Sequence, residues 1–154
     1  MKITDFLDPR AVTLNLQATD KEGVLHELVN LLAQSKDLGD KKAVVKSLID
    51  RENLGSTGIG QGIAIPHGKT DKVKELCACL GISQKGVNFD SLDGEPVYIF
   101  FLLVAPKDSA GPHLKALARV SRLLRDTYFC QLIRSAKSDQ DAYQLITAEE
   151  DKRP

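Results

Sequence analysis

The sequence predicts an α/β fold, a single domain in which a mixed β-sheet is flanked by helices. Several segments show apolar residues at helical spacing, and a near-continuous apolar run at 96–106 is typical of a central strand. No internal repeat or low-complexity linker divides the 154 residues. A chain of this length buries about 68 to 70% of its unfolded surface. We therefore expect one domain over residues 1–154, with a core from about 12 to 148.

The first third of the chain is predicted to contain one strand and two helices. Residues 12–16 (VTLNL) alternate apolar and polar side chains, which is typical of a strand. Asp20 offers an N-cap for a helix whose apolar stripe runs from 24 to 32, and a second helix is expected from Asp40 to about Glu52. The following segment, RENLGSTGIGQG, holds four glycines between 55 and 62, which indicates unusual backbone conformations or a closely approaching ligand.

Residues 62–69 read GIAIPHGK and place a histidine directly after a short apolar segment. Residues 62–65 are expected to form a short buried strand, and Pro66 cannot donate to a central ladder. Gly68 would permit a close turn that carries the chain away. His67 would then sit on a rigid elbow and face whatever approaches the end of the strand.

The rest of the chain is predicted to contain two strands and three helices before a frayed tail. The run at 96–106 (PVYIFFLLVAP) would be the central strand, covered on both faces. Ser138 begins a capping sequence for the last helix. The expected elements are strands at 75–83 and 96–106, helices at about 112–125, 127–136 and 138–146, and a frayed tail at 149–154.

The composition argues against several classes of function. Lys plus Arg (21) equals Asp plus Glu (21), so no overall field attracts nucleic acid or an anionic membrane, and only 5% of residues are aromatic. No apolar run approaches the length of a membrane span, and the first residues lack the apolar core of a signal peptide. We expect a cytoplasmic protein with no membrane insertion, whose three cysteines are reduced.

Three motifs with possible cofactor chemistry do not meet their requirements. Gly68-Lys69-Thr70 resembles the end of a phosphate-binding P-loop, but the required glycine is replaced by Ile63. Gly58-Ile59-Gly60 begins a dinucleotide fingerprint that fails at the same isoleucine. Cys77 and Cys79 would share one face of a strand; two buried apolar residues are favoured over a zinc site, because the usual C-x2-C spacing is missing. We expect no cofactor and no metal.

The three histidines differ in their surroundings. His26 lies on the polar side of its predicted helix and is expected to be solvated. His113 is the second residue of a helix begun by Gly111-Pro112; the helix terminus would keep its imidazole neutral, although its apolar helix face fits a packed histidine equally well. His67 is the strongest functional candidate, because a neutral imidazole is a competent nucleophile near pH 7.

Phosphoryl transfer is the chemistry that these residues favour. It requires positioning and positive charge around the phosphoryl oxygens. The candidates for phosphate binding are Arg51, the hydroxyls and amides of Ser56, Thr57 and Gly58, and His113. Lys115, Arg119 and Arg122 form a basic stripe on the helix after His113; a solvated helix face is favoured over a docking patch for this stripe.

Two long strings, RENLGSTGIGQGIAIPHGK and GVNFDSLDGEPVYIFFLLVAPKDSAGPHLKALARVSRLL, strongly resemble the IIA proteins of the phosphoenolpyruvate-dependent phosphotransferase system, in the fructose and mannitol class. The likeness covers about 14 to 146. It implies a mixed sheet flanked by helices, and a histidine in the IAIPH motif, His67, that accepts phosphate from the phosphocarrier HPr or its relative NPr as a tele-phosphohistidine. It also implies that Arg51 binds the phosphate and that His113 flanks His67.

Within this class, the stand-alone length and the ending SDQDAYQLITAEE look more like nitrogen-regulatory IIA proteins than sugar-transport subunits. This resemblance implies a phosphorelay that acts on regulatory target proteins. Two alternatives stay open: a fructose- or mannitol-type transport component that passes phosphate to a IIB cysteine, and a module that binds partners without transferring phosphate.

Overall fold

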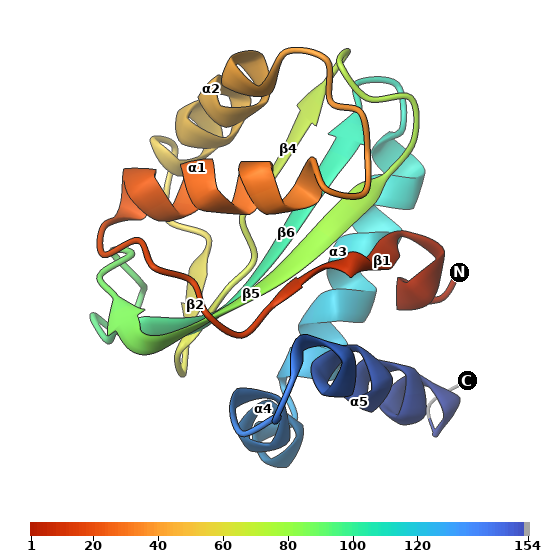
Figure 1. Cartoon of the computed structure of the whole chain (residues 1–154). Coiled ribbons are helices and arrows are strands. Elements are labelled where there is room, and N and C mark those ends of the chain that lie inside the picture. The colour runs from red at the N-terminus through yellow and green to blue at the C-terminus, as the bar shows by residue number, and fades with distance from the viewer. Residues whose placement is uncertain (153–154) are drawn as a thin grey trace.

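The computed structural model describes residues 1–152 and shows a six-stranded mixed sheet covered by helices on both faces (Figure 1). The strand order is β1-β5-β6-β3-β2, and β4 also pairs with β6. The strands are β1 (Leu7–Thr13), β2 (Gly58–Gly60), β3 (Ile63–Ala64), β4 (His67–Thr70), β5 (Cys77–Val87) and β6 (Val97–Pro106). The helices are α1 (Lys21–Leu32), α2 (Lys41–Glu52), α3 (Ala110–Leu124), α4 (Thr127–Arg134) and α5 (Asp139–Asp151), and a short 3-10 helix spans Ile3–Asp5. The predicted fold class is therefore confirmed.

Side-chain caps fix where α1, α2 and α5 begin. Asp20 accepts the Gly23 N–H at 2.6 Å at the start of α1, and Asp40 does the same for α2 through Ala43 at 3.2 Å. Ser138 caps α5 in the same way. Such caps satisfy backbone donors that would otherwise lack partners, so they set the boundaries locally. The two caps expected at Asp20 and Ser138 are confirmed.

The central strand β6 divides the core into two layers. Its alternate residues Ile99, Phe101 and Leu103 pack in the layer under α3, α4 and α5. Phe100 and Leu102 pack on the other side with α1 and α2. These β6 side chains are at most 1% exposed, so both faces of the strand are buried. The prediction of a strand covered on both faces is confirmed.

The first strand lies earlier than the alternation of residues 12–16 predicted. Strand β1 spans Leu7–Thr13 and pairs in parallel with β5 at the edge of the sheet. Beyond Thr13, the Leu14 N–H donates to a carboxylate oxygen of Asp139 in α5, and the Leu16 N–H donates to the Ile82 carbonyl of β5 at 2.9 Å. Leu14 and Leu16 are still buried. The alternation of residues 12–16 therefore predicted correctly which side chains are buried, but it placed the strand too late in the sequence.

The chain does not turn away after His67, contrary to the prediction. Strands β3 and β4 both run parallel to β6, and they keep the same register with it on either side of Ile65 and Pro66. Pro66 has no N–H to donate, but its carbonyl accepts the Leu103 N–H at 2.9 Å. Gly68 serves close packing instead of a turn: a Cβ there would lie 3.1 Å from Ser47 Oγ on α2.

The tail was predicted to fray from residue 149, but helix α5 continues to Asp151. Glu150 is 5% exposed and accepts the backbone N–H of Ile3 at 2.6 Å and Arg119 Nε at 3.2 Å. The two ends of the chain accordingly lie side by side (Figure 1). The last two residues, Arg153 and Pro154, are outside the described residues.

Replacing Glu150 with alanine is expected to lower the free energy of unfolding by about 2 to 3 kcal/mol, because a buried N–H and a guanidinium lose their acceptor. Chemical denaturation measures this loss. Asp151→Ala is the matched control: its carboxylate is 62% exposed and pairs with the exposed Lys2 at 3.6 Å, so its loss should be within about 0.5 kcal/mol. Equal losses in the two variants would contradict the buried contact.

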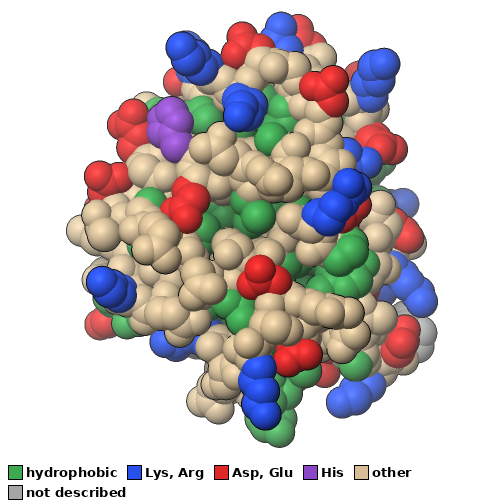
Figure 2. All heavy atoms as spheres, in the orientation of Figure 1, with side chains coloured by type: hydrophobic (Ala, Val, Ile, Leu, Met, Phe, Trp, Pro, Cys, Tyr) green, Lys and Arg blue, Asp and Glu red, His purple; other side chains and the backbone are tan. Residues whose placement is uncertain are grey.

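Acidic and basic side chains are interspersed over the face drawn in Figure 2, in keeping with their equal counts of 21 and 21. Within residues 1–152, none of the helices combines the length and the apolar character that crossing a membrane requires.

Candidate functional site

A pocket of about 490 Å³ lies where the end of α2, strand β4 and the start of α3 meet. It brings together three of the residues predicted to act, Arg51, His67 and His113, which are separated by up to 62 positions in the sequence. Its other lining residues are Ser47, Asp50, Leu54, Gly68, Lys69, Ala110, Leu114 and Leu117. Of these, Leu54 and Leu114 are 85% and 67% exposed, so the pocket has an apolar rim open to solvent.

His67 is oriented by a hydrogen bond to the backbone. It is the first residue of β4, and its Nδ1 lies 2.8 Å from the carbonyl oxygen of Ile65. A carbonyl oxygen can only accept, so Nδ1 carries the proton and Nε2 keeps its lone pair. The nucleophilic nitrogen of this imidazole is therefore Nε2.

The ring of His113 lies beside that of His67. Their centroids are 5.6 Å apart and the planes meet at 75°, an edge-to-face arrangement. His113 is 4% exposed, and its Nε2 has no hydrogen-bond partner among the described residues. Burial, together with the positive charges of a protonated His67 and of Lys69, lowers the pKa of His113 to about 4. It is thus neutral at pH 7, with one nitrogen unsatisfied.

Arg51 supplies positive charge to the pocket. It lies in the last turn of α2, and its Nη1 donates to the carbonyl oxygen of Gly55 at 2.9 Å. Burial lowers the pKa of His67, and the charge of Arg51 lowers it further. The hydrogen bond to Ile65 and the charge of Glu52 oppose this change without cancelling it. His67 is accordingly a neutral imidazole at pH 7, as a nucleophile must be.

The structure does not place Ser56, Thr57 and Gly58 around this pocket, although the sequence suggested them for phosphate binding. Ser56 lines a separate cavity of about 540 Å³ on the other side of Leu54. The polar groups of the three residues already have partners: the Ser56 hydroxyl donates to Phe89 O and accepts the Gly58 N–H, and Thr57 donates to Glu52. These donors hold the glycine-rich loop itself.

Sequence reasoning assigned no role to Lys69, Leu114 or Glu52. Lys69 follows Gly68 on β4 and lines the pocket, so it adds a second cation beside the histidines. Leu114 adds apolar rim directly after His113. Closeness in sequence to a candidate residue was the available signal: Leu114 and Glu52 directly follow His113 and Arg51, and Lys69 lies two positions after His67.

The remaining singled-out residues lie outside the pocket. His26 is exposed on α1, as predicted, with Nε2 4.0 Å from a Glu22 oxygen. None of the three cations of the basic stripe lines the pocket, and Arg119 is committed to Glu150. The stripe therefore contributes no side chain to the lining of this pocket.

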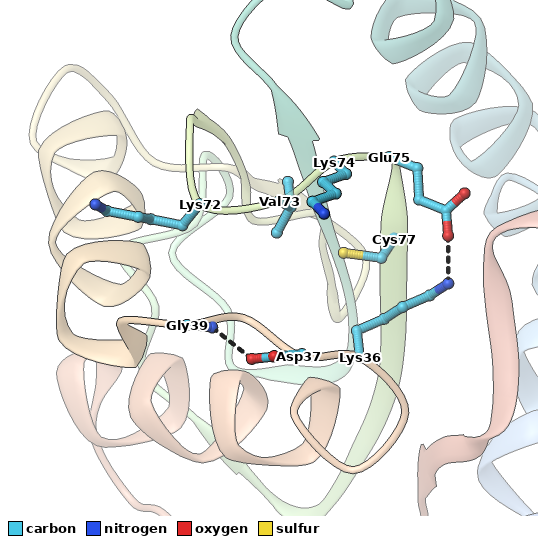
Figure 3. Close-up of a pocket in the computed structure, with 8 residues that line it drawn as sticks. All are labelled: Lys36, Asp37, Gly39, Lys72, Val73, Lys74, Glu75 and Cys77. Atoms are coloured by element: carbon cyan, nitrogen blue, oxygen red, sulfur yellow. Dashed lines mark hydrogen bonds and ion pairs between the residues drawn. The ribbon is translucent and has the colours of Figure 1, made fainter.

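The cysteines are free thiols in buried positions. Cys77 borders a cavity of about 330 Å³ between the loop after α1 and the loop after β4 (Figure 3). Burial raises the pKa of this thiol to about 11, so it is neither a nucleophile nor a ready metal ligand at neutral pH. Lys36 there is already paired with Glu75 at 2.7 Å. Nowhere in residues 1–152 are three His, Cys, Asp or Glu side chains grouped to hold a metal ion.

The stability of the fold should depend on pH through His113. Its pKa is lowered on folding, so below pH 6.5 the unfolded chain binds a proton that the folded chain excludes until about pH 4. The change from 6.5 to about 4 corresponds to about 3 kcal/mol of stability, present above pH 6.5 and lost as the pH falls to 4. We expect His113→Gln to unfold with a correspondingly weaker pH dependence, measured by denaturation at several pH values. Identical slopes for the two proteins would contradict the burial of a neutral imidazole.

The sequence and the fold are similar to those of known proteins. The family model for the "Phosphoenolpyruvate-dependent sugar phosphotransferase system, EIIA 2" matches residues 5–149. A nitrogen regulatory protein of Bradyrhizobium diazoefficiens is 38% identical over 146 residues, which are 95% of each chain. A fructose-specific EIIABC component of Bacillus subtilis is 39% identical over 140 residues, 90% of this chain but only 22% of that protein.

A solved structure shows the same fold. The crystal structure of the nitrogen regulatory protein IIA-Ntr from Neisseria meningitidis superposes with a TM-score of 0.87 at 28% identity, over 94% of this chain and 98% of that one. The family model covers nearly the whole sequence, and the relatives at 38 and 39% identity span most of it. The chain belongs to the EIIA 2 family of the phosphoenolpyruvate-dependent sugar phosphotransferase system.

Proposed function

We propose that this protein is a phosphocarrier that accepts a phosphoryl group on Nε2 of His67 from HPr or NPr. The observation that carries the proposal is the hydrogen bond from Nδ1 to Ile65, which leaves Nε2 as the free nucleophile of a neutral ring. Arg51 and a second neutral histidine line the same pocket. Family membership supports the general chemistry, and the acceptor atom is our assignment.

In the proposed step, the lone pair of Nε2 attacks the phosphorus of the donor's phosphohistidine in line. The bond between phosphorus and the donor nitrogen breaks as the new bond forms, and the electron pair returns to the donor imidazole. Arg51 and Lys69 would balance the charge of the phosphoryl oxygens. The unpaired Nε2 of His113, if it carries the ring proton, would donate to one of these oxygens. The group comes directly from the donor, so the step requires no cofactor.

The apolar rim supports transfer between two proteins. Leu54 and Leu114 are large apolar side chains that remain exposed beside the reactive ring. A shallow, partly apolar surface of this kind suits a transient partner, whose interface is small. The donor's histidine must approach to bonding distance, and the open pocket leaves room for it.

We further propose that the relay is of the nitrogen-regulatory type, with regulatory proteins as targets. The support is the end-to-end match to the Bradyrhizobium diazoefficiens nitrogen regulatory protein and the TM-score of 0.87 with the Neisseria meningitidis protein. The donor stays open between HPr and NPr, and the cytoplasmic location expected from the sequence stays a prediction.

Sugar transport is the second candidate, because the identity to the fructose-specific Bacillus subtilis component is equally high. In that case a IIB cysteine would take the phosphoryl group from His67 rapidly. A module that only binds partners is less well supported, since the pocket retains a free Nε2 together with Arg51.

The test is incubation with phosphoenolpyruvate, enzyme I and either HPr or NPr, followed by intact mass before and after brief acid treatment. We expect a gain of one phosphoryl group that acid removes, as is typical of a phosphoramidate. No gain with either donor would overturn the phosphocarrier assignment. Rapid transfer from the labelled protein to a fructose- or mannitol-type IIB domain would replace the regulatory assignment with the transport one.

A further inference from the structure

Glu52 is a buried carboxylate that the proposed chemistry does not use. It is 5% exposed and lies in the last turn of α2, directly after Arg51. This is an unfavourable place for a negative charge, because the C-terminal end of a helix is itself partly negative and burial removes water. A carboxylate kept there must have partners that compensate for both effects.

The partners of Glu52 come from two other segments. Its oxygens accept the Thr57 N–H at 3.1 and 3.2 Å and also the Thr57 hydroxyl. Lys21 Nζ, at the first residue of α1, lies 3.0 Å from Oε1. Thr57 is itself 4% exposed, so the contact is shielded from water. The carboxylate thereby joins the start of α1 to the loop that follows α2.

A short chain of contacts leads from this carboxylate to Arg51. The loop from Gly55 to Thr57 is held at its far end by the Thr57 contacts and at its near end by the Gly55 N–H, which donates to the Glu52 carbonyl at 3.0 Å. The carbonyl of the same Gly55 accepts Nη1 of Arg51 at 2.9 Å. Consecutive helix residues point about 100° apart, so Glu52 can face the loop while Arg51 lines the pocket of His67.

We propose that Glu52 is a positioning residue for phosphoryl transfer. Together with Lys21 it fixes the loop at 55–57, and the Gly55 carbonyl then holds the Arg51 guanidinium where the phosphoryl oxygens arrive. A guanidinium held in place before the donor binds loses less freedom during the reaction. This inference rests on the proposed function of His67. It also changes the role of Thr57, which would support the site by binding Glu52 and not by binding phosphate.

The main experiment measures single-turnover transfer from the phosphorylated donor to Glu52→Gln, which keeps the shape of the side chain and removes its charge. We expect the rate constant at saturating donor to fall about tenfold, with donor affinity unchanged. The matched control is Glu22→Gln, whose exposed carboxylate borders the same cavity as Glu52, and it should transfer at the normal rate. A wild-type rate for Glu52→Gln would overturn the proposal.

A double-mutant cycle distinguishes positioning from a direct effect of charge on His67. If Glu52 acts through Arg51, Glu52→Gln should have no further effect in an Arg51→Ala background. Effects that multiply would show that Glu52 acts by another route and would overturn the inference. If Glu52→Gln does not fold, Thr57→Val should reproduce the slower transfer while Thr57→Ser restores it, and equal rates for those two variants would count against the network.

Nitrogen-15 NMR of the Arg51 side chain keeps this test independent of phosphoryl transfer. We expect separate, slowly exchanging guanidinium signals in the wild-type protein and averaged signals in Glu52→Gln. Unchanged signals would overturn the positioning role even if the wild type accepts phosphate. Failure of the wild type to accept phosphate would instead overturn the proposed function, while the NMR comparison would still decide whether Glu52 holds Arg51.

Discussion

Replacing His67 with alanine is expected to abolish acceptance of a phosphoryl group completely. The other ring in the pocket cannot take over, because His113 is 4% exposed and is held on helix α3, whereas His67 is only partly buried at the pocket surface. The measurement is intact mass after incubation with phosphoenolpyruvate, enzyme I and the donor. The wild-type protein should gain one acid-labile group and His67→Ala none.

The attacking nitrogen can be tested in the same experiment. Nitrogen-15 NMR of the labelled wild-type protein should place phosphorus on Nε2, because Nδ1 is committed to Ile65. His26→Ala is the control: this histidine is exposed on α1, outside the pocket, and its loss should leave labelling intact. Labelling of His67→Ala, or phosphorus on Nδ1, would contradict the assignment.

The sequence predicted most of the helices, because their ends depend on local chemistry. Asp20 and Ser138 lie directly before apolar stripes and cap them through their own side chains. Strand boundaries depend on partners far along the chain and were less accurate. Just after the end of β1, the Leu14 N–H donates to Asp139, which lies 125 residues further along the chain. No local pattern around residues 12–16 reports that contact.

The site was predicted from its motif, and its supporting contacts were not. Arg51, His67 and His113 line one pocket, and the family resemblance had implied that they lie close together. The loop residues Ser56 and Thr57 looked equally suitable, because a sequence shows hydroxyls and amides without showing their partners. In the fold those groups bind Phe89 and Glu52, so they shape the loop. What these polar groups do therefore depends on tertiary contacts, which the spacing of residues along the sequence does not reveal.

Two wrong predictions, the turn at Gly68 and the frayed tail from residue 149, also reflect tertiary contacts that the sequence does not show. Gly68 suggested a turn, yet it lies within β4, where a Cβ would make a tight 3.1 Å contact with Ser47 Oγ on α2. Glu150 looked like part of a polar tail, yet it is buried against the first residues of the chain. The sequence shows which residue stands at each position. What Gly68 and Glu150 do depends on the residues that pack against them in the fold.

Replacing Arg51 with alanine is expected to slow phosphoryl transfer about 100-fold, comparable to the removal of one oxyanion donor in an enzyme. In the proposed step Arg51 would neutralise charge on the phosphoryl oxygens. It also lowers the pKa of His67, but this effect is small at pH 7, where burial already keeps the ring neutral. The loss should therefore lie in the transfer step. Single-turnover kinetics with phosphorylated HPr or NPr would measure it, with the rate constant reported separately from the affinity for the donor.

Arg51→Lys separates charge from geometry. Lysine retains the positive charge but lacks the planar fork that can bind Gly55 and a phosphoryl oxygen at the same time. We expect a rate between those of Arg51→Ala and the wild type. Full activity of Arg51→Lys would show that charge alone suffices, and the loop carbonyl would then have no role in transfer. A rate as low as that of Arg51→Ala would show that the fixed guanidinium geometry contributes nearly all of the effect, which is the arrangement that the contacts of Gly55 and Glu52 support.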